Sequence, residues 1–401
     1  MSGLLVTLRI ALVRLGFRLG GLLPLRPRVV LATAHADRIG GNLACLRDEL
    51  ARRRPRIPVV VLASRPATGP RGRIAAAAHA LRAGYHLATA RAFVVDDYFF
   101  PMYVIRPRPG TTFVQVWHAC GAFKKFGYSA RDRSFGADEA LLRRVRIHAN
   151  YHVCLVSSRS VAPHYAEAFG QPLERFVARL GIPRTDLFFD EARVARVSEA
   201  LRRRYRLPAG RRVILYAPTF RGESVTRARY AEHLDLDLLQ ATLGDDCVVL
   251  LRLHPFIRDR HPIPAALREF AIDVSDHHDM NELMLISDIL VTDYSSVIYE
   301  YSLLGRPILF LAPDVEAYEG ERGFYFDFRE GVPGPVFETT AELAAHIRSG
   351  RFDLARVDAF RRASFDVADG RSSARVVDEI VLPALAGRRP ATTSTDGGPG
   401  G

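Results

Sequence analysis

The sequence predicts an α/β protein of two doubly wound domains that face each other across a cleft. Its 401 residues suffice for two or three domains, each with a core of its own. Its composition, 48% hydrophobic and 25% charged, is that of an ordinary globular protein and excludes a chain that is disordered throughout. Short β-branched runs alternate with helical stretches along most of the chain, which is typical of parallel strands joined by crossover helices.

Residues 27–185 form the first predicted domain. Its apolar runs are short and rich in valine, as expected for strands of a parallel sheet that helices cover on both faces. Helical stretches follow several of these runs, including one that carries Leu43, Leu46 and Leu50. The expected strands are Arg28–Ala34, Pro58–Ala63, Ala92–Asp96, Phe113–Trp117 and His152–Ser157.

Residues 186–386 form the second predicted domain. A break at Gly181–Arg184 precedes it, and a charged helix is expected over residues 190–206. In open parallel sheets, ligands bind beyond the carboxyl ends of the strands, so the residues that follow each strand are the first candidates for a site in the cleft. The expected strands are Val213–Ala217, Val248–Leu253, Ala271–Val274, Ile289–Asp293 and Pro307–Leu311.

The two ends of the chain differ from its body. In residues 1–26, leucines recur at helical spacing and arginines lie outside their stripe. The charges argue against a membrane-spanning helix, so two interpretations stay open: a helix in the interface of an anionic membrane, which we favour, or a helix packed on the protein. Residues 387–401 consist mainly of Arg, Pro, Thr and Gly and are expected to be a disordered tail. The leucines are Leu4, Leu8, Leu12, Leu15 and Leu19, and the arginines are Arg9, Arg14 and Arg18.

The charge and the missing motifs narrow the class of function. A net charge of +12 favours an anionic partner, such as nucleic acid, acidic lipid or a phosphorylated substrate. The four cysteines form no C-x-x-C pair, which disfavours a zinc site and fits a reducing cytoplasm. No apolar run reaches the roughly 18 residues of a membrane span. The motifs of hydrolases, P-loop proteins and dinucleotide-dependent oxidoreductases are missing, and we expect neither a metal nor another cofactor.

A histidine and a lysine pair follow the strand expected at Phe113–Trp117. His118 stands directly after this strand, where an imidazole can accept a proton near neutral pH. Lys124 and Lys125 are the only lysines among the 56 residues that are Lys or Arg. A flexible ammonium group in a loop with glycines suits a phosphate. The alternative is a buried histidine bonded to backbone, with solvated lysines, and the combination of residues favours the functional interpretation.

Two further strand ends carry polar side chains. His254 directly follows the run Val248–Leu253. Arg221 lies four residues after the run Val213–Ala217, at the end of the sequence Pro-Thr-Phe-Arg. The proline after His254 stops the strand and leaves the imidazole at its tip.

A hydroxyl-rich turn separates the strand expected at Ile289–Asp293 from a helix. Ser295 and Ser296 would direct hydroxyls, together with backbone N–H groups, at one place, which suits a phosphate or pyrophosphate without a metal. The alternative is that Ser295 only caps the helix. Glu300, further along this helix, is expected either to reach a hydroxyl of the ribose or acceptor or to be a solvated carboxylate.

Together these residues resemble the CDP-glycerol glycerophosphotransferase family, the teichoic-acid primases and polymerases. The resemblance covers roughly residues 110–311 and rests on five motifs that occur in the family's order. The motifs are QVWHACGAFKKFGYS (115–129), LGIPRTDLFF (180–189), ILYAPTFR (214–221), LRLHP (251–255) and DMNELMLISDILVTDYSSVIYEYSLLGRPILF (279–310).

The resemblance implies a glycosyltransferase-B-like fold and a specific reaction. Glycerol phosphate, or a similar polyol phosphate, would pass from CDP-glycerol or CDP-ribitol to a hydroxyl of a lipid-linked or polymeric acceptor, with release of CMP. The resemblance also implies that the protein is attached peripherally to the cytoplasmic face of the cell membrane, with no nucleic-acid partner. Two rival functions are a nucleotide-sugar-dependent glycosyltransferase of the same fold and a non-catalytic basic protein that binds nucleic acid or lipid.

The resemblance also implies roles for individual residues. His118 would be the base on the acceptor side and His254 a second catalytic residue at the donor phosphates. The chain departs from the family's usual pattern at Ala119, where glycine is common, and at Glu300, where aspartate is common. The second departure bears on how the polyol is held. The implied substrate-binding residues are Lys124, Lys125, Arg221, Asp293, Ser295, Ser296 and Glu300.

Overall fold

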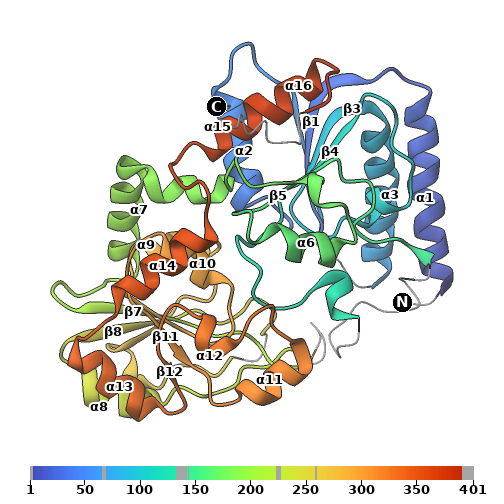
Figure 1. Ribbon diagram of the computed structural model, residues 1–401. Coiled ribbons are helices and arrows are strands. Elements are labelled where there is room, and N and C mark those ends of the chain that lie inside the picture. Colours follow the sequence, from blue (N-terminus) through green and yellow to red (C-terminus); the bar gives the residue numbers. More distant parts are fainter. Residues whose placement is uncertain are drawn as a thin grey trace. The chain divides into compact units, whose positions relative to one another are not determined.

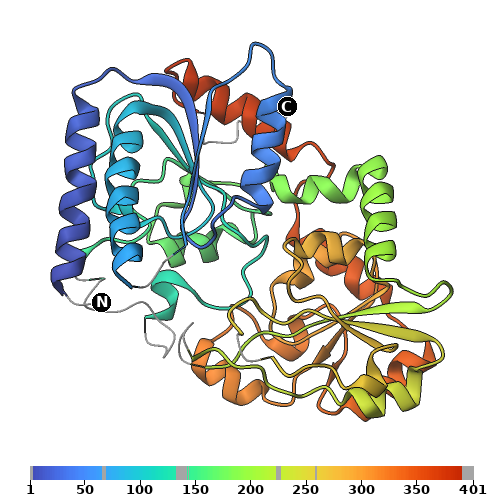
Figure 2. The same ribbon diagram turned by 180° about the vertical axis from the view of Figure 1, so that it is seen from behind.

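A computed structural model of the chain describes residues 3–65, 69–131, 142, 144–222, 227–257 and 260–390. The chain forms two compact units, which Figures 1 and 2 show from opposite sides. The first unit comprises residues 1–118, 137–186 and 365–401, and the second comprises residues 119–136 and 187–364. This division differs from the expected domains, because residues 119–131 belong to the second unit and residues 365–386 to the first. The expected tail lies outside the described residues from residue 391 onward.

The first unit is built on a sheet of six parallel strands in the order β2-β1-β3-β4-β5-β6. The central strands are almost completely buried, as the valine-rich runs predict for a sheet covered on both faces. The sequence did not indicate β6, which is only two residues long. The strands are β1 (Arg26–Thr33), β2 (Val59–Ala63), β3 (Ala90–Val95), β4 (Thr112–Gln115), β5 (Val153–Leu155) and β6 (Phe176–Val177).

Most helices of the first unit belong to the first half of the chain, and α15 and α16 come from its C-terminal part. The segment after residue 364 returns to this unit, where α15 packs on α2 and α16 on β1 and β3. The Asp186 carboxylate accepts hydrogen bonds from the N–H groups of Ser372 and Ser373 and so holds the start of α15. The helices are α1 (Gly3–Gly21), α2 (Gly41–Arg52), α3 (Gly69–Thr89), α4 (Phe100–Tyr103), α6 (Ala162–Phe169), α15 (Ser372–Val376) and α16 (Leu382–Leu385), with the short 3-10 helix η2 (Leu173–Arg175) and the π-helical segment η6 (Val377–Val381).

The second unit has its own sheet of six parallel strands, in the order β12-β11-β10-β7-β8-β9. This is the strand order of a dinucleotide-binding Rossmann fold, whose direction of winding reverses between the first and fourth strands, here β7 and β10. The five expected strands are present, and β12 is the one the sequence did not indicate. The strands are β7 (Arg212–Ala217), β8 (Cys247–Leu251), β9 (Ala271–Asp273), β10 (Ile289–Thr292), β11 (Ile308–Leu311) and β12 (Val336–Phe337).

Helices flank this second sheet and complete its core. The expected charged helix is present as α7. At the start of α9, the Asp279 side chain accepts the N–H of Asn281 and caps the helix. Glu282 pairs with His277 and does not complete a capping box with Asp279. The helices are α7 (Glu191–Arg204), α8 (Leu236–Leu243), α9 (Met280–Leu285), α10 (Val297–Ser302), α11 (Val315–Arg322), α12 (Phe328–Gly331), α13 (Thr340–Ser349) and α14 (Leu354–Ser364), with the short turns η1 (Gly127–Ala130) and η5 (Ala265–Leu267); η3 (Pro183–Phe189) spans the division.

Helix α1 packs along α3, and the two helices lie side by side in both views (Figures 1 and 2). Glycines allow their backbones to approach closely. A Cβ on Gly16 would lie 2.1 Å from the carbonyl oxygen of Leu81, and one on Gly84 would lie 2.1 Å from that of Val13. The other side of α1 exposes leucines, among them Leu4 at 80% of its surface, and Leu22, directly after the helix, is 83% exposed. One side of α1 is thus packed on the protein, and membrane binding by the other side stays a prediction.

None of the helices in the described part of the chain has the length and apolar character needed to cross a membrane.

We expect Gly84→Ala to lower the free energy of unfolding by about 1–3 kcal/mol, because the added Cβ forces α1 away from α3. Urea denaturation followed by circular dichroism measures this loss. Gly21→Ala is the matched control, since a Cβ at the end of α1 meets nothing within 4 Å. Equal losses for the two variants would contradict the close packing of these helices.

Candidate functional site

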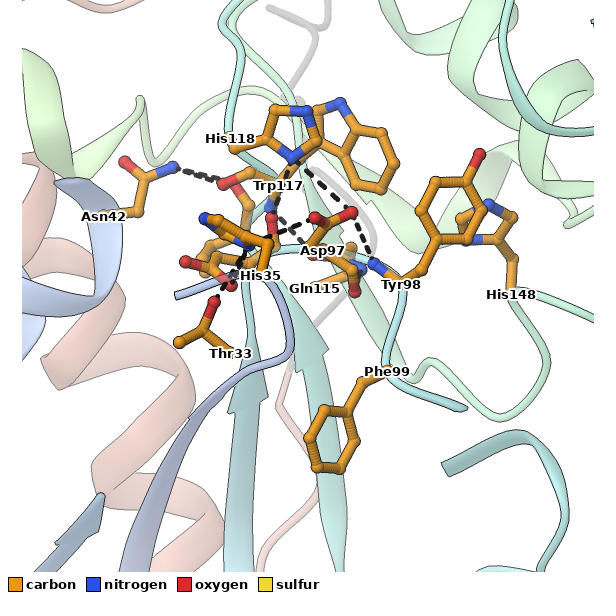
Figure 3. Close-up of polar contacts among 12 residues, drawn as sticks. Thr33, His35, Asn42, Asp97, Tyr98, Phe99, Gln115, Trp117, His118 and His148 are labelled. Atoms are coloured by element: carbon orange, nitrogen blue, oxygen red, sulfur yellow. Dashed lines mark hydrogen bonds and ion pairs between the residues drawn. The ribbon is translucent and has the colours of Figure 1, made fainter. Parts of the chain in front are cut away.

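Polar side chains of the first unit gather at the carboxyl edge of its sheet, where β1, β3 and β4 are neighbours. His35 follows β1, Asp96 and Asp97 follow β3, and His118 follows β4 (Figure 3). The winding of this sheet reverses between β1 and β3, and such a switch point is where open parallel sheets bind ligands. The side chain of His118 is 45% exposed, so its imidazole is accessible to a substrate.

The loop that carries His118 is held in an unusual backbone conformation. Trp117 has a φ of 50°, a left-handed value that costs a non-glycine residue roughly 1–2 kcal/mol. The side-chain oxygen of Gln115 accepts the Trp117 N–H at 2.8 Å, and the Asn42 amide donates to the carbonyls of Val116 and Trp117 at 2.9 and 2.8 Å. These bonds maintain the strained turn, and the Trp117 ring stacks on His118 at 4.5 Å between centroids.

Asn42 also connects the His118 loop to the segment that contains Arg184. Its side-chain oxygen accepts the N–H of Arg184, whose guanidinium in turn donates to the carbonyl of His118 at 2.6 Å. Asn42 is 2% exposed, so its polar atoms depend on these partners. A single buried amide therefore fixes the position of the backbone on either side of Trp117.

Charged groups surround the imidazole of His118. Its Nδ1 lies 3.2 Å from the carbonyl oxygen of Asp96 and 3.8 Å from Oδ1 of Asp97. Burial raises the pKa of Asp96 to about 6. Burial also opposes the charge of Asp97, but His118 and His35 outweigh it and lower the pKa of that carboxyl. The hydrogen bond to Asp97 raises the pKa of His35.

A second polar cluster lies in the second unit, at the switch point between β7 and β10. Asp293 accepts hydrogen bonds from the N–H and hydroxyl of Thr219 at 2.8 and 2.9 Å and from Arg221 at 2.9 Å. Arg221 also makes a bidentate pair with Asp314 at 2.7 and 3.0 Å, and Tyr294 donates to the same carboxylate. The strand tips are thus bonded to one another through charged groups.

Burial and pairing shape the charges of this cluster. Arg221 is 8% exposed and lies over the rings of Tyr294 and Tyr318. Burial opposes its charge, but Asp314 and Asp293 outweigh burial and raise its pKa. For Asp314, burial is likewise outweighed by His233 and Arg221, which hold its pKa far below the ordinary value. Both Arg221 and Asp293 connect the tips of β7 and β10, and their role as substrate contacts stays a prediction.

The remaining donor-side candidates lie around this edge of the second sheet. His254 follows β8, the neighbour of β7, and packs on Phe220 at 4.8 Å between centroids. Ser295 and Ser296 are half-buried in the turn between β10 and α10, where the Ser295 hydroxyl accepts the Val297 N–H at 3.4 Å. The expected strand–turn–helix arrangement is therefore present, with Ser296 at the N-cap of α10 and without a side-chain capping bond from it. Phosphate binding by these residues stays a prediction.

The lysine pair and Glu300 also belong to the second unit. Lys124 pairs with Phe324 in an isolated β-bridge, and its Nζ lies 3.3 Å from the hydroxyl of Tyr318. Tyr318 stacks on Tyr294 at 4.0 Å, so Lys124 adjoins the cluster around Arg221. Lys125 is half-buried beside it, and Glu300 is 3% exposed within α10.

Reasoning from the sequence missed His35, Asn42 and Asp97 as members of the site in the first unit. The sequence did contain an indication for Asp97. This residue directly follows the expected strand Ala92–Asp96, just as His118 directly follows the expected strand Phe113–Trp117. Asn42 gave only a turn signal after Gly40-Gly41. Within the described residues, no group of three or more His, Cys, Asp or Glu side chains could hold a metal ion. All four cysteines are free thiols.

Solved structures resemble this fold closely. The wall teichoic acid polymerase TagF aligns with a TM-score of 0.76 at 24% identity, over 92% of this chain and 93% of that chain. A UDP-GlcNAc 2-epimerase from Neisseria meningitidis aligns with a TM-score of 0.55 at 12% identity, over 88% of this chain and 100% of that chain. Two Rossmann-like units of this kind define the glycosyltransferase-B-like fold, which this chain shares with both structures.

Sequence comparison identifies the family. The model of the CDP-glycerol:poly(glycerophosphate) glycerophosphotransferase family matches residues 18–382. The teichoic acid ribitol-phosphate primase of Bacillus spizizenii is 40% identical over 365 residues, 90% of this chain and 93% of the primase. The poly(ribitol-phosphate) polymerase of the same organism is 41% identical over 300 residues, 75% of this chain but 48% of the polymerase. The chain belongs to this glycerophosphotransferase family, and the resemblance seen in the motifs is confirmed.

We expect Asn42→Ala to lower kcat by about 10-fold or more, because the loop that carries His118, the predicted base, loses the amide that holds its turn. Steady-state kinetics, at a temperature where circular dichroism shows a folded protein, measure the effect.

Asn150→Gly is the matched control for this variant. The Asn150 amide also donates to two carbonyls, those of Met102 and Ile105, and its φ of 74° suits glycine. An equal loss of kcat in both variants would show that general destabilisation, and not the His118 loop, explains the result.

Proposed function

We propose that this enzyme transfers a polyol phosphate from a CDP-polyol to a hydroxyl of a membrane-linked acceptor and releases CMP, in the synthesis of a teichoic-acid-like polymer. The observation that carries the proposal is the placement of His118 in a chain of this family. The imidazole is half exposed at a sheet switch point, with Nδ1 directed at a carbonyl and a carboxylate. Because a carbonyl oxygen only accepts, Nδ1 carries the proton and the Nε2 lone pair is left for a substrate.

The chemistry requires a base on one side and cationic groups on the other. The attacking hydroxyl loses its proton to His118 as its oxygen bonds to the phosphorus of the polyol phosphate. The P–O bond to CMP breaks, and CMP leaves with the electron pair. A positioned histidine base typically contributes about 10²–10⁴-fold to such a rate. Preorganised donors at the leaving phosphates contribute a further factor.

The donor phosphates are assigned to the second unit. His254, Ser295 and Ser296 lie at one edge of its sheet, and Lys124 adjoins the same cluster through Tyr318. Lys125 follows Lys124 in the same loop. This gathering of imidazole, hydroxyl and ammonium groups supports a pyrophosphate site.

The relatives favour ribitol as the polyol. Those named for ribitol phosphate are 36–41% identical to this chain, and those named for glycerol phosphate are 30–35% identical. Glu300, which replaces the aspartate common in the family, is longer by one methylene and lies on the helix that follows the Ser295 turn. We assign CDP-ribitol as the preferred donor, with CDP-glycerol as the weaker substrate.

A donor panel tests this function. We expect CMP to appear from CDP-ribitol and, more slowly, from CDP-glycerol in the presence of a lipid-linked acceptor, and no UDP to appear from UDP-glucose. Nucleotide chromatography measures these products. His118→Ala should lower the rate of CMP release by about 10²-fold or more while leaving donor affinity nearly unchanged. Release of UDP without CMP would instead make the enzyme a nucleotide-sugar-dependent glycosyltransferase.

We also propose that α1 attaches the enzyme to the cytoplasmic face of the cell membrane. One side of α1 is occupied by its packing on α3, and the opposite side exposes leucines along several turns. Arg9 lies over the Phe100 ring and Arg14 donates to the Val104 carbonyl, whereas Arg18 is exposed beside the leucines. An apolar helix face with an exposed cation suits shallow binding to an anionic bilayer. The exposed leucines are Leu4, Leu5, Leu8, Leu15, Leu19 and Leu22.

We expect the triple variant Leu8→Gln, Leu15→Gln, Leu19→Gln to bind anionic vesicles at least about 10-fold more weakly in flotation assays, because it loses apolar area at the bilayer. Activity on a soluble acceptor should stay unchanged, since these side chains face away from α3. The control is Leu173→Gln with Leu354→Gln, two exposed leucines elsewhere on the chain. Undiminished flotation of the triple variant would exclude α1 as the attachment surface.

A further inference from the structure

The carboxylate of Asp97 lies between two imidazoles. Its Oδ2 is 3.1 Å from Nδ1 of His35, and its Oδ1 is 3.8 Å from Nδ1 of His118. The rings of the two histidines are 6.1 Å apart, and Figure 3 shows both with Nδ1 turned towards this carboxylate. The three residues come from the ends of β1, β3 and β4, which are adjacent in the sheet.

The carboxylate is held in place from several sides. The N–H of Tyr98 donates to its Oδ1 at 2.6 Å, and the Gln115 amide donates to the Asp97 carbonyl at 3.1 Å. On the opposite side, Nδ1 of His35 lies 3.0 Å from the hydroxyl of Thr33, so the ring of His35 has its own support. The position of Asp97 relative to His118 is therefore determined by the strand ends and not by a flexible side chain.

We propose that Asp97 is a positioning residue for His118: together with the Asp96 carbonyl it holds the imidazole with the proton on Nδ1, and it balances the positive charge of the imidazolium formed during transfer. His35 completes the arrangement by binding the other carboxylate oxygen. The proposal rests on the proposed function only in naming His118 as the base. In other proteins, a carboxylate or carbonyl beside one ring nitrogen of a functional histidine commonly sets its tautomer in this way.

The O–H bond of the acceptor breaks and an Nε2–H bond forms on His118, which becomes an imidazolium ion beside the carboxylate of Asp97. The imidazolium gives its proton to solvent before the next turnover. Asp97 itself takes no proton, in keeping with its lowered pKa, whereas its neighbour Asp96 titrates at about 6. Asp97 therefore keeps its charge through the neutral pH range, and Asp96 adds a second negative charge near His118 above about pH 6.

Kinetics of Asp97→Asn provide the first test. We expect kcat for CMP release to fall by about 10²-fold or more while KM for CDP-ribitol changes less than about 3-fold, because the variant alters only the base. Asp37→Asn is the matched control: it removes an exposed carboxylate in the same unit, paired with Arg65, and should leave both constants unchanged. A kcat within about 3-fold of wild type for Asp97→Asn would overturn the proposal.

The tautomer of His118 provides the second test, which needs neither activity nor a variant at Asp97. In ¹⁵N-histidine-labelled protein, with the His118 signal identified by its loss in His118→Gln, we expect the neutral ring to carry its proton on Nδ1. In Asp97→Asn, an amide can donate to Nδ1, so the Nε2–H form should gain population. A wild-type ring with its proton on Nε2 would overturn the proposal. If no CDP-polyol releases CMP, the proposed function fails, but this spectrum still decides the role of Asp97.

Discussion

The uniform direction of the strands is the constraint on which this protein's chemistry depends. Every strand pair in both sheets is parallel, so all the strand ends of a unit meet at one edge. Residues far apart in the chain, such as His35 and His118, come within 4 Å of one carboxylate only for this reason. In open parallel sheets this is the edge at which ligands bind.

The two units use the same edge differently. In the first unit, the two imidazoles at the switch point are nearly half exposed, and a buried amide, Asn42, fixes the backbone of the His118 loop. In the second unit, Arg221 and its two carboxylates are largely satisfied by one another, which ties the strand tips together while hydroxyls and His254 lie around them. A partly exposed imidazole suits proton transfer, whereas a preorganised polar edge suits the binding of phosphates.

Much of this arrangement could be predicted from local patterns. The valine-rich runs indicated five of the six strands in each sheet, and the first residues after those runs included His118, His254 and Ser295. The two-residue strands β6 and β12 were invisible, because so short a segment has no period to detect. Asp97 also follows a strand, but a pair of carboxylates has many structural uses. Only the tertiary structure shows that Asp97 lies beside the imidazoles of His35 and His118.

The sequence by itself determined the alternation of strands and helices, the family and the residues at the strand tips, because these depend on short-range pattern and on motif order. Tertiary structure alone decided which tips are neighbours, because strand order depends on how crossover helices pack and not on any local period. It therefore decided that Asp97 faces His118, that Arg221 is buried between Asp293 and Asp314, and that α1 packs one side on α3 while it exposes leucines on the other. Amphipathic spacing marks the faces of a helix, but only the shape of its neighbour determines which face is covered.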